Sequence, residues 1–197
     1  MLAHPNPGPF TRIVMPTLRT ARPGDVPAIR DLIVQSVRGL SVSVYSPAQI
    51  ESALTYIFGV DTQLIADGTY YIIVDADAVV AAGGWSGRQT LFGGDQHKGE
   101  ADLTIDPATS PARIRAFFVH PAWARRGLAR RIYAACEAAA AAAGFRRFEL
   151  MATLPGVPLY RALGFVDLEP VSVPLPDGLT LPCIHMQRPM GVLSRES

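Results

Sequence analysis

The sequence predicts an α/β or α+β domain in which helices cover a central sheet. Segments rich in β-branched and aromatic residues recur along the chain, and amphipathic helical segments lie between them. The length of 197 residues suits one well-buried domain better than two. We assign the domain to residues 17–190, with flexible tails over 1–16 and 191–197.

The amino-terminal part is expected to hold one short strand and two helices. A strand over 18–21 is followed by a turn, in which Asp25 is expected to cap the first helix. A second helix is expected over 47–57. It follows Ser46, and Gln49 stands three residues after this serine, which is the pattern of a capping box.

A hairpin and a long irregular segment are expected to follow. The stretches 68–74 and 79–85 are rich in aromatic and β-branched residues and are joined by a short polar turn. Residues 87–110 are polar and irregular, and a loop of this length is usually functional or disordered. The next strand is predicted over 114–119.

The carboxy-terminal half is expected to contain two helices and three strands. Helical periodicity begins near Gly127 and ends before Gly144, a plausible left-handed cap. A short helix over 158–165 is capped by Gly164. Strands are expected over 148–153, 166–173 and 179–187.

Charge and cysteine content narrow the function classes. The formal net charge of +1 argues against a general nucleic-acid-binding surface. The two cysteines, Cys136 and Cys183, show no metal-type spacing and fit a reducing cytosol. No run reaches the ~20 apolar residues that span a bilayer. We therefore expect a cytoplasmic protein with no metal, nucleic-acid or membrane partner.

The segment 114–131 predicts an anion site. His120 and Pro121 end a strand, and the turn that follows lies at a helix N-terminus, where unpaired N–H groups and the macrodipole favour an anion. Gly127 and Ala129 leave the backbone accessible. Four arginines add charge-assisted donors, namely Arg125, Arg126, Arg130 and Arg131. A solvated basic surface is the alternative, but the helix dipole repels these arginines, so we favour anion binding.

Two motifs resemble the GCN5-related N-acetyltransferase (GNAT) superfamily. They are the strand, turn and helix of residues 113–143 and the segment Leu159-Tyr160-Arg161-Ala162-Leu163-Gly164-Phe165. The element order extends the resemblance over about 18–186. It implies a mixed, mostly antiparallel sheet of about seven strands with a splayed strand pair and about four helices.

The resemblance also implies how acetyl-CoA is held as co-substrate. The turn Ala124-Arg125-Arg126-Gly127-Leu128-Ala129 matches the family's pyrophosphate motif, with Ala124 where the family has Arg or Gln. Backbone N–H groups do most of the binding in such a turn, so the site is expected to be weakened rather than lost. The implied contacts are Phe118, Val119, Arg125, Arg126, Gly127, Leu128, Ala129 and Arg130.

Tyr160 matches the family tyrosine that lies near the departing sulfur. A phenol with a pKa near 10 can protonate a leaving thiolate. The residues alone favour Tyr160 as one core aromatic of a short amphipathic helix. The resemblance favours the catalytic role, and it places the oxyanion near a backbone N–H close to Val119.

The general base is less defined. Some family members carry a glutamate early on the strand before the turn, and Arg113 occupies that position here. Glu149 is a candidate because it interrupts an apolar strand, although alternation could place it on a solvated face. Glu100, Asp102 and Asp106 could reach the cleft from the preceding loop, and solvated positions are favoured for them.

The expected activity is acetyl transfer from acetyl-CoA to a primary amine of a small molecule or peptide, by direct attack on the thioester. Tyr45, Tyr70 and Trp85 could line the acceptor pocket or belong to the core. The alternative function is an acyl-CoA-binding sensor without turnover. Exposed strand edges could also pair two chains into a homodimer.

Overall fold

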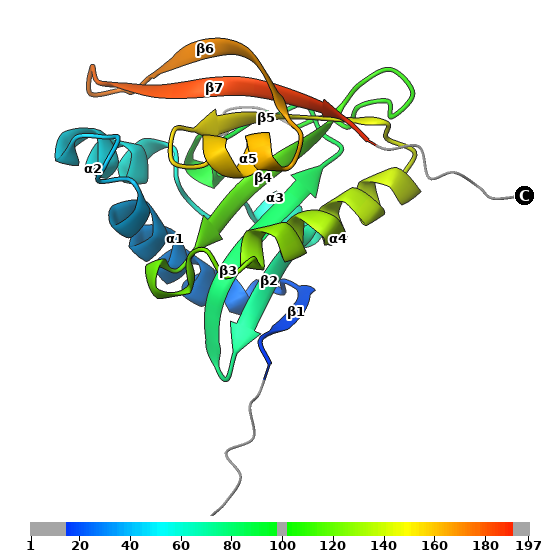
Figure 1. Ribbon diagram of the computed structural model, residues 1–197, viewed down its shortest axis with the longest axis horizontal. Helices are drawn as coiled ribbons and strands as arrows, with labels where there is room; N and C mark the ends of the chain where they lie inside the picture. The colour runs from blue at the N-terminus through cyan, green and yellow to red at the C-terminus, as the bar shows by residue number, and fades with distance from the viewer. Residues whose placement is uncertain (1–14, 98–101, 191–197) are drawn as a thin grey trace, which may run out of the picture.

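A seven-stranded mixed sheet forms the centre of the computed structural model, which describes residues 15–97 and 102–190 (Figure 1). The strands are β1 (Thr17–Thr20), β2 (Tyr70–Asp75), β3 (Ala78–Ser86), β4 (Ala112–Val119), β5 (Arg147–Thr153), β6 (Val166–Pro174) and β7 (Thr180–Pro189). Their order across the sheet is β1-β2-β3-β4-β5-β7-β6. Among the described strands only β4 and β5 pair in parallel, so the mostly antiparallel sheet implied by the resemblance is confirmed.

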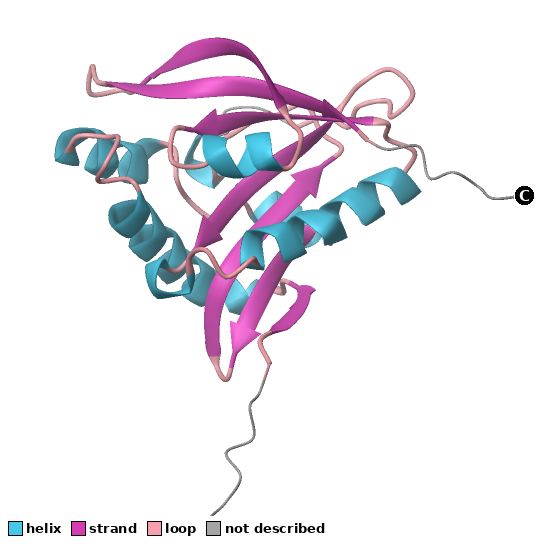
Figure 2. Cartoon of the chain, viewed as in Figure 1, coloured by secondary structure: helices cyan, strands magenta, loops and turns pink. Residues whose placement is uncertain are grey.

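Helices cover both faces of this sheet. They are α1 (Val26–Leu40), α2 (Pro47–Tyr56), α3 (Thr62–Ala66), α4 (Leu128–Ala142) and α5 (Val157–Ala162). The consecutive residues Ile72 and Ile73 of β2 belong to two different core clusters, one with α1 and one with α4. Because successive strand residues point to opposite faces, the clusters lie on opposite sides of the sheet. Figure 2 shows α4 in front of the strands and α3 behind them.

Local signals placed most of these elements. Ser46 and Gln49 form the expected capping box at the start of α2, and Gly144 has the expected positive φ (+94°) after α4. Asp25 precedes α1 but does not cap it through its side chain, because its carboxylate instead accepts the Arg22 N–H (2.7 Å) and pairs with Arg19.

The described residues form five α-helices, close to the expected number of about four. The additional helix, α3, is five residues long and was missed, since so short a segment shows no helical periodicity. It begins after Asp61, whose side chain accepts the Leu64 N–H (3.4 Å). The expected tails fall largely on residues 1–14 and 191–197, which lie outside the described residues, as does Glu100.

The central strands β4 and β5 separate soon after they meet. They pair only at Ala112↔Phe148 and Arg113↔Glu149, and beyond these positions no ladder joins the described residues of the two strands. The splayed pair implied by the resemblance is therefore present. Polar backbone groups on the facing edges are left available for a ligand in the resulting gap.

A β-bulge bends β4 inside this gap. The pairing of β4 with β3 shifts between Ala82 and Gly84, and Ala116 has a positive φ of 55°. The buried Tyr70 hydroxyl donates to the Ala116 carbonyl (3.1 Å). This bond turns the Ala116 carbonyl towards the core and fixes the bent backbone. Both cysteines are free thiols, and no helix in the described part of the chain is long and apolar enough to cross a bilayer.

Candidate active site

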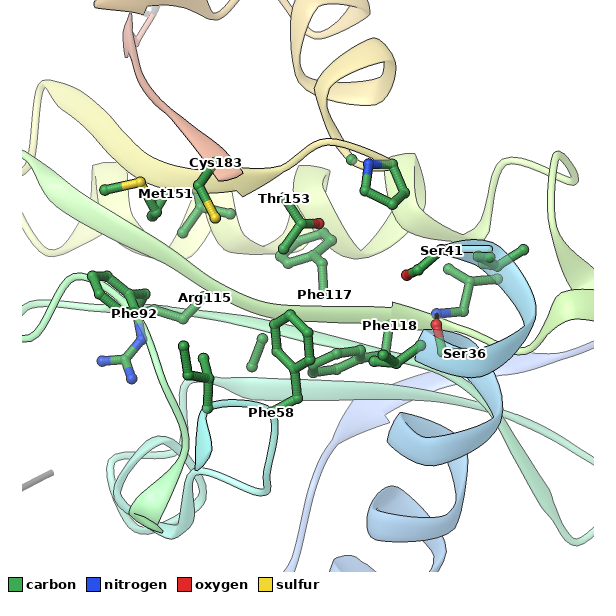
Figure 3. A pocket seen from close by; sticks show the side chains of 18 of the residues that line it. Ser36, Ser41, Phe58, Phe92, Arg115, Phe117, Phe118, Met151, Thr153 and Cys183 are labelled. Carbon is green, nitrogen blue, oxygen red and sulfur yellow. Dashed lines mark hydrogen bonds between the residues drawn. The ribbon is translucent and has the colours of Figure 1, made fainter. Parts of the chain in front are cut away.

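A cavity of about 340 Å³ occupies the gap between β4 and β5 (Figure 3). Residues 114–119 of β4 form one wall, and Met151 and Thr153 of β5 form the other. The carboxy-terminal end of α1, the start of α5, the loops around residues 58 and 92, and parts of β6 and β7 complete it. The gap between the splayed strands is therefore lined as a cavity to which a substrate could bind.

One end of the cavity reaches the turn before α4. Ala124, Arg125 and Ala129 line it there. The first hydrogen bond of α4 runs from the Arg131 N–H to the Gly127 carbonyl (3.1 Å), so the N–H groups of the preceding residues have no partner within the helix. These groups and the helix dipole make the turn suitable for an anion.

The backbone of this turn is held in unusual conformations. Gly127 has φ +79° and Arg125 has φ +63°. A Cβ built at Gly127 would meet nothing within 4 Å, so glycine serves the conformation and leaves the turn open to solvent. Left-handed conformations at Arg125 and Gly127, on either side of Arg126, shape the turn.

The four arginines of the turn differ in their contacts. Arg125 lines the cavity. Arg126 stacks on Trp123, with its Cζ 4.8 Å from the ring centroid. Arg130 donates to the Ala162 carbonyl (3.4 Å) and Arg131 to the Pro16 carbonyl (2.6 Å). Three of the four therefore have structural contacts that the sequence did not reveal, and Arg125 is the side chain best placed to meet an anion in the cavity.

The strand residues expected to bind the cofactor both reach the cavity. Phe118 pairs with Ala82 of β3, and its ring lies in the cavity. The Val119 N–H is directed away from β3, because the neighbouring His120 N–H closes the ladder with Val80 (2.9 Å). The Val119 N–H donates to Ser36 Oγ (3.1 Å), a buried hydroxyl that sequence reasoning did not identify.

Tyr160 lines the cavity and also packs in the core. It is 8% exposed and makes edge-to-face contacts with Phe117 (6.3 Å) and Phe165 (5.7 Å). Desolvation raises the pKa of Tyr160 above its ordinary value of 10.0. The phenol therefore keeps its proton at neutral pH and is available as a proton donor.

Glu149 does not line the cavity. It forms an ion pair with Arg113, its cross-strand neighbour, and lies 3.8 Å from His185 Nε2. Strand alternation nevertheless places it on the same face as Met151 and Thr153, which do line the cavity. Arg113, which stands where some family members carry a glutamate, thus contacts Glu149, the candidate general base.

The remaining acidic and aromatic candidates have structural roles. Asp102 accepts the Thr90 N–H (2.8 Å) and Asp106 accepts the Ala108 N–H (2.9 Å). The Tyr45 hydroxyl donates to the Pro182 carbonyl (2.6 Å) and accepts the Leu154 N–H (2.9 Å). Trp85 packs against Phe145. With Tyr70 held at the bulge, none of the three proposed pocket aromatics lines the cavity.

The cavity wall contains a buried ion pair that no sequence pattern predicts. Arg115 of β4 contacts Asp61 before α3, and the guanidinium also donates to the carbonyls of Thr90 (2.9 Å) and Gly93 (2.5 Å). These contacts tie two loops to β4. Phe58 and Phe92, which those loops present to the cavity, were also missed because isolated loop aromatics carry no pattern.

A family model described as the acetyltransferase (GNAT) family matches residues 42–165, which is more than half of the chain. The match includes α2 to α5, and it contains the pyrophosphate turn and the Tyr160 segment. None of the curated proteins matches the chain.

Solved structures of similar fold cover nearly the whole chain. A GCN5-related N-acetyltransferase from Rhodopseudomonas palustris has a TM-score of 0.66 at 20% identity, covering 89% of this chain and 96% of its own. The paiA N-acetyltransferase from Thermoplasma acidophilum, in complex with coenzyme A, has a TM-score of 0.63 at 10% identity, with 89% and 99% covered. The yncA protein from Salmonella typhimurium, with its cofactor acetyl-CoA, has a TM-score of 0.60 at 15% identity, with 93% and 99% covered.

Proposed function

The chain belongs to the acetyltransferase (GNAT) family, and we propose that it transfers an acetyl group from acetyl-CoA to a primary amine by direct attack on the thioester. The single observation that carries the proposal is the continuity of the cavity. It runs from the anion-binding turn at Arg125, along β4, to Tyr160. A donor and an acceptor could therefore meet in one space.

The turn would hold the pyrophosphate of acetyl-CoA. Its N–H groups at the start of α4 and the Arg125 side chain supply the donors, and Arg126 and Arg130 add positive charge nearby. The pantetheine arm would lie along the open edge of β4 at Phe118 and Val119. The coenzyme A and acetyl-CoA complexes of two similar structures support this assignment.

The reaction exchanges a C–S bond for a C–N bond and moves one proton from the amine to the sulfur. The neutral amine attacks the thioester carbonyl carbon, forming a C–N bond, and the C–S bond then breaks to release the CoA thiolate. Tyr160 would give its proton to the thiolate and regain one from solvent, while the amine would lose its proton to a general base. A backbone N–H near Val119 would stabilise the oxyanion. Orientation of both substrates in one cavity contributes much of the rate.

We propose Glu149 as the acceptor of the amine proton, with water as the relay. Its place on the cavity-facing side of β5 supports the role, and the ion pair with Arg113 would orient the carboxylate. The acceptor is expected to be a small-molecule or peptide amine. Both cysteines are free thiols, which fits a cytoplasmic location.

The proposal is tested by isothermal titration with acetyl-CoA, followed by a thiol-release assay over a panel of amines. We expect saturable binding and amine-dependent CoA release. No acetyl-CoA binding would contradict the proposal at its first step. Binding without CoA release for any amine would favour the alternative, an acyl-CoA sensor. Two features support that alternative: the Glu149 carboxylate is paired with Arg113, and alanine occupies position 124.

A further inference from the structure

The cavity has two chemically different ends. Figure 3 shows the hydroxyls of Ser36 and Ser41 towards one end, and Phe92, Met151 and Cys183 towards the other. The first end is continuous with the turn at Arg125, where the proposed function places the donor. The second end is therefore the space left for the acceptor.

The acceptor end is apolar and carries no net charge. Among the described residues that line the cavity, none has a carboxylate, and the cations are Arg115 and Arg125. Arg115 is neutralised by Asp61, whose Oδ2 lies 2.7 Å from Nη2, and it also donates to two carbonyls. Burial raises the pKa of the Cys183 thiol to about 11, so this group is neutral as well.

Aromatic and aliphatic side chains form the walls of this end. Phe58 packs edge-to-face on Phe118, with ring centroids 6.2 Å apart, and Phe92 stacks on His97 at 4.9 Å. Phe58, Phe92 and Met151 are only half-buried, so the end opens to solvent. A second substrate could enter there, whereas a pocket for a longer acyl chain on the donor would not need an opening of its own.

We infer that the acceptor is an amine whose remaining part is apolar and uncharged, such as an arylalkylamine, rather than a polyamine or aminoglycoside. The inference rests on the proposed function and specifies its second substrate. An aryl group would exchange water for the rings of Phe58 and Phe92, which is favourable. A second ammonium group would lose its hydration without gaining a carboxylate, which is costly.

The first experiment compares 2-phenylethylamine with spermidine at saturating acetyl-CoA. We expect kcat/KM for 2-phenylethylamine to be at least about 10-fold higher, which corresponds to about 1.4 kcal/mol. Equal or reversed preference with acetyl transfer intact would overturn this inference and leave the proposed function standing. Absence of acetyl-CoA binding would overturn both, and calorimetry of each amine with CoA present tests the preference without turnover.

The second experiment places a carboxylate at the apolar end. Met151→Glu should shift the preference towards spermidine by at least about 10-fold, whereas the uncharged Met151→Gln should not. Val166→Glu adds the same charge at an exposed position outside the cavity and should leave the preference unchanged. An unchanged preference in Met151→Glu, or a preference for butyryl-CoA over acetyl-CoA with one amine, would contradict the assignment of this end to the acceptor.

Discussion

Arg115 and Asp61 form an ion pair inside the protein, with Nη2 2.7 Å from Oδ2 and side chains that are 1% and 0% exposed. Desolvation lowers the pKa of Arg115, and Asp61 opposes this effect. The pair joins β4, which carries the proposed donor site, to the loop before α3 on the acceptor side. The ion pair thus holds the proposed donor region and the proposed acceptor region in one arrangement.

Removing one member of this pair is expected to be strongly destabilising. Arg115→Met leaves Asp61 buried without its cation, which should cost about 3–5 kcal/mol of unfolding free energy. Chemical denaturation measures the loss. Arg38→Met, which removes an exposed guanidinium paired with Glu51, is the control and should cost under about 1 kcal/mol. If the double variant Arg115→Met/Asp61→Leu is no more stable than Arg115→Met, the assigned cause is wrong.

Tyr160→Phe tests the proton donor. Loss of the hydroxyl should lower kcat by about 100-fold and leave acetyl-CoA affinity nearly unchanged, because the ring contacts with Phe117 and Phe165 remain. Since burial raises the pKa of Tyr160, ionisation of the phenol should not appear in the wild-type rate profile up to pH 10. Undiminished turnover in the variant would remove the acid role.

Gly127→Ala tests the anion-binding turn. The positive φ of +79° makes alanine unfavourable by about 1 kcal/mol, and the added methyl group would stand where a pyrophosphate approaches the backbone. The Kd for acetyl-CoA, measured by titration calorimetry, should rise about 10-fold. Gly178→Ala is the control, because Gly178 has a similar φ (+86°) and open surroundings but lies in the β6–β7 turn. This variant should lose stability and keep its affinity for acetyl-CoA. If both variants raise the Kd for acetyl-CoA equally, the turn before α4 is not the pyrophosphate site.

Local signals explain why so much of the fold could be predicted. Glycine at the end of α4 and the capping box at Ser46 are read from adjacent residues, and aromatic and β-branched residues on either side of a polar turn predicted the hairpin. The pairing of Arg113 with Glu149 depends on the parallel register of two strands distant in the sequence, so no local pattern reveals it. The same applies to Arg115 with Asp61. The sequence thus indicated the turn proposed to bind the donor, whereas the end proposed for the acceptor depends on loops brought together by tertiary contacts.

Ser36→Ala tests how β4 is prepared for the donor. Ser36 Oγ accepts the Val119 N–H (3.1 Å), the group proposed to meet the pantetheine arm or the oxyanion. Without ligand, the variant should lose about 1–2 kcal/mol of stability, because a half-buried N–H loses its partner. Acetyl-CoA no longer has to displace the hydroxyl, so its affinity should rise roughly 3–10-fold.

Thermal unfolding with and without acetyl-CoA separates these two effects. Without ligand, Ser36→Ala should have a lower melting temperature than wild type. Acetyl-CoA should then raise the melting temperature of the variant by more than it raises that of wild type. Ser41→Ala removes another buried hydroxyl of the cavity wall and serves as the control. Weaker acetyl-CoA binding in Ser36→Ala than in Ser41→Ala would show that Ser36 itself contacts the donor, contrary to this prediction.

Asp25→Asn is expected to make stability less dependent on acid pH. Arg19 forms a bidentate pair with Asp25 (2.7 Å for both contacts) and lowers the pKa of this carboxyl below its ordinary value of 3.8. The ionised carboxylate therefore stabilises the fold fully above pH 3.8, and this contribution is lost as the pH falls through the lower folded-state pKa. Because Arg19 is partly exposed, we expect the variant to lose only about 1 kcal/mol at pH 7 and to approach wild-type stability in acid.

Denaturation at several pH values measures this convergence, with Asp177→Asn at an exposed turn as control. A difference between wild type and Asp25→Asn that stayed constant down to pH 2 would show that packing, and not the charge, is responsible.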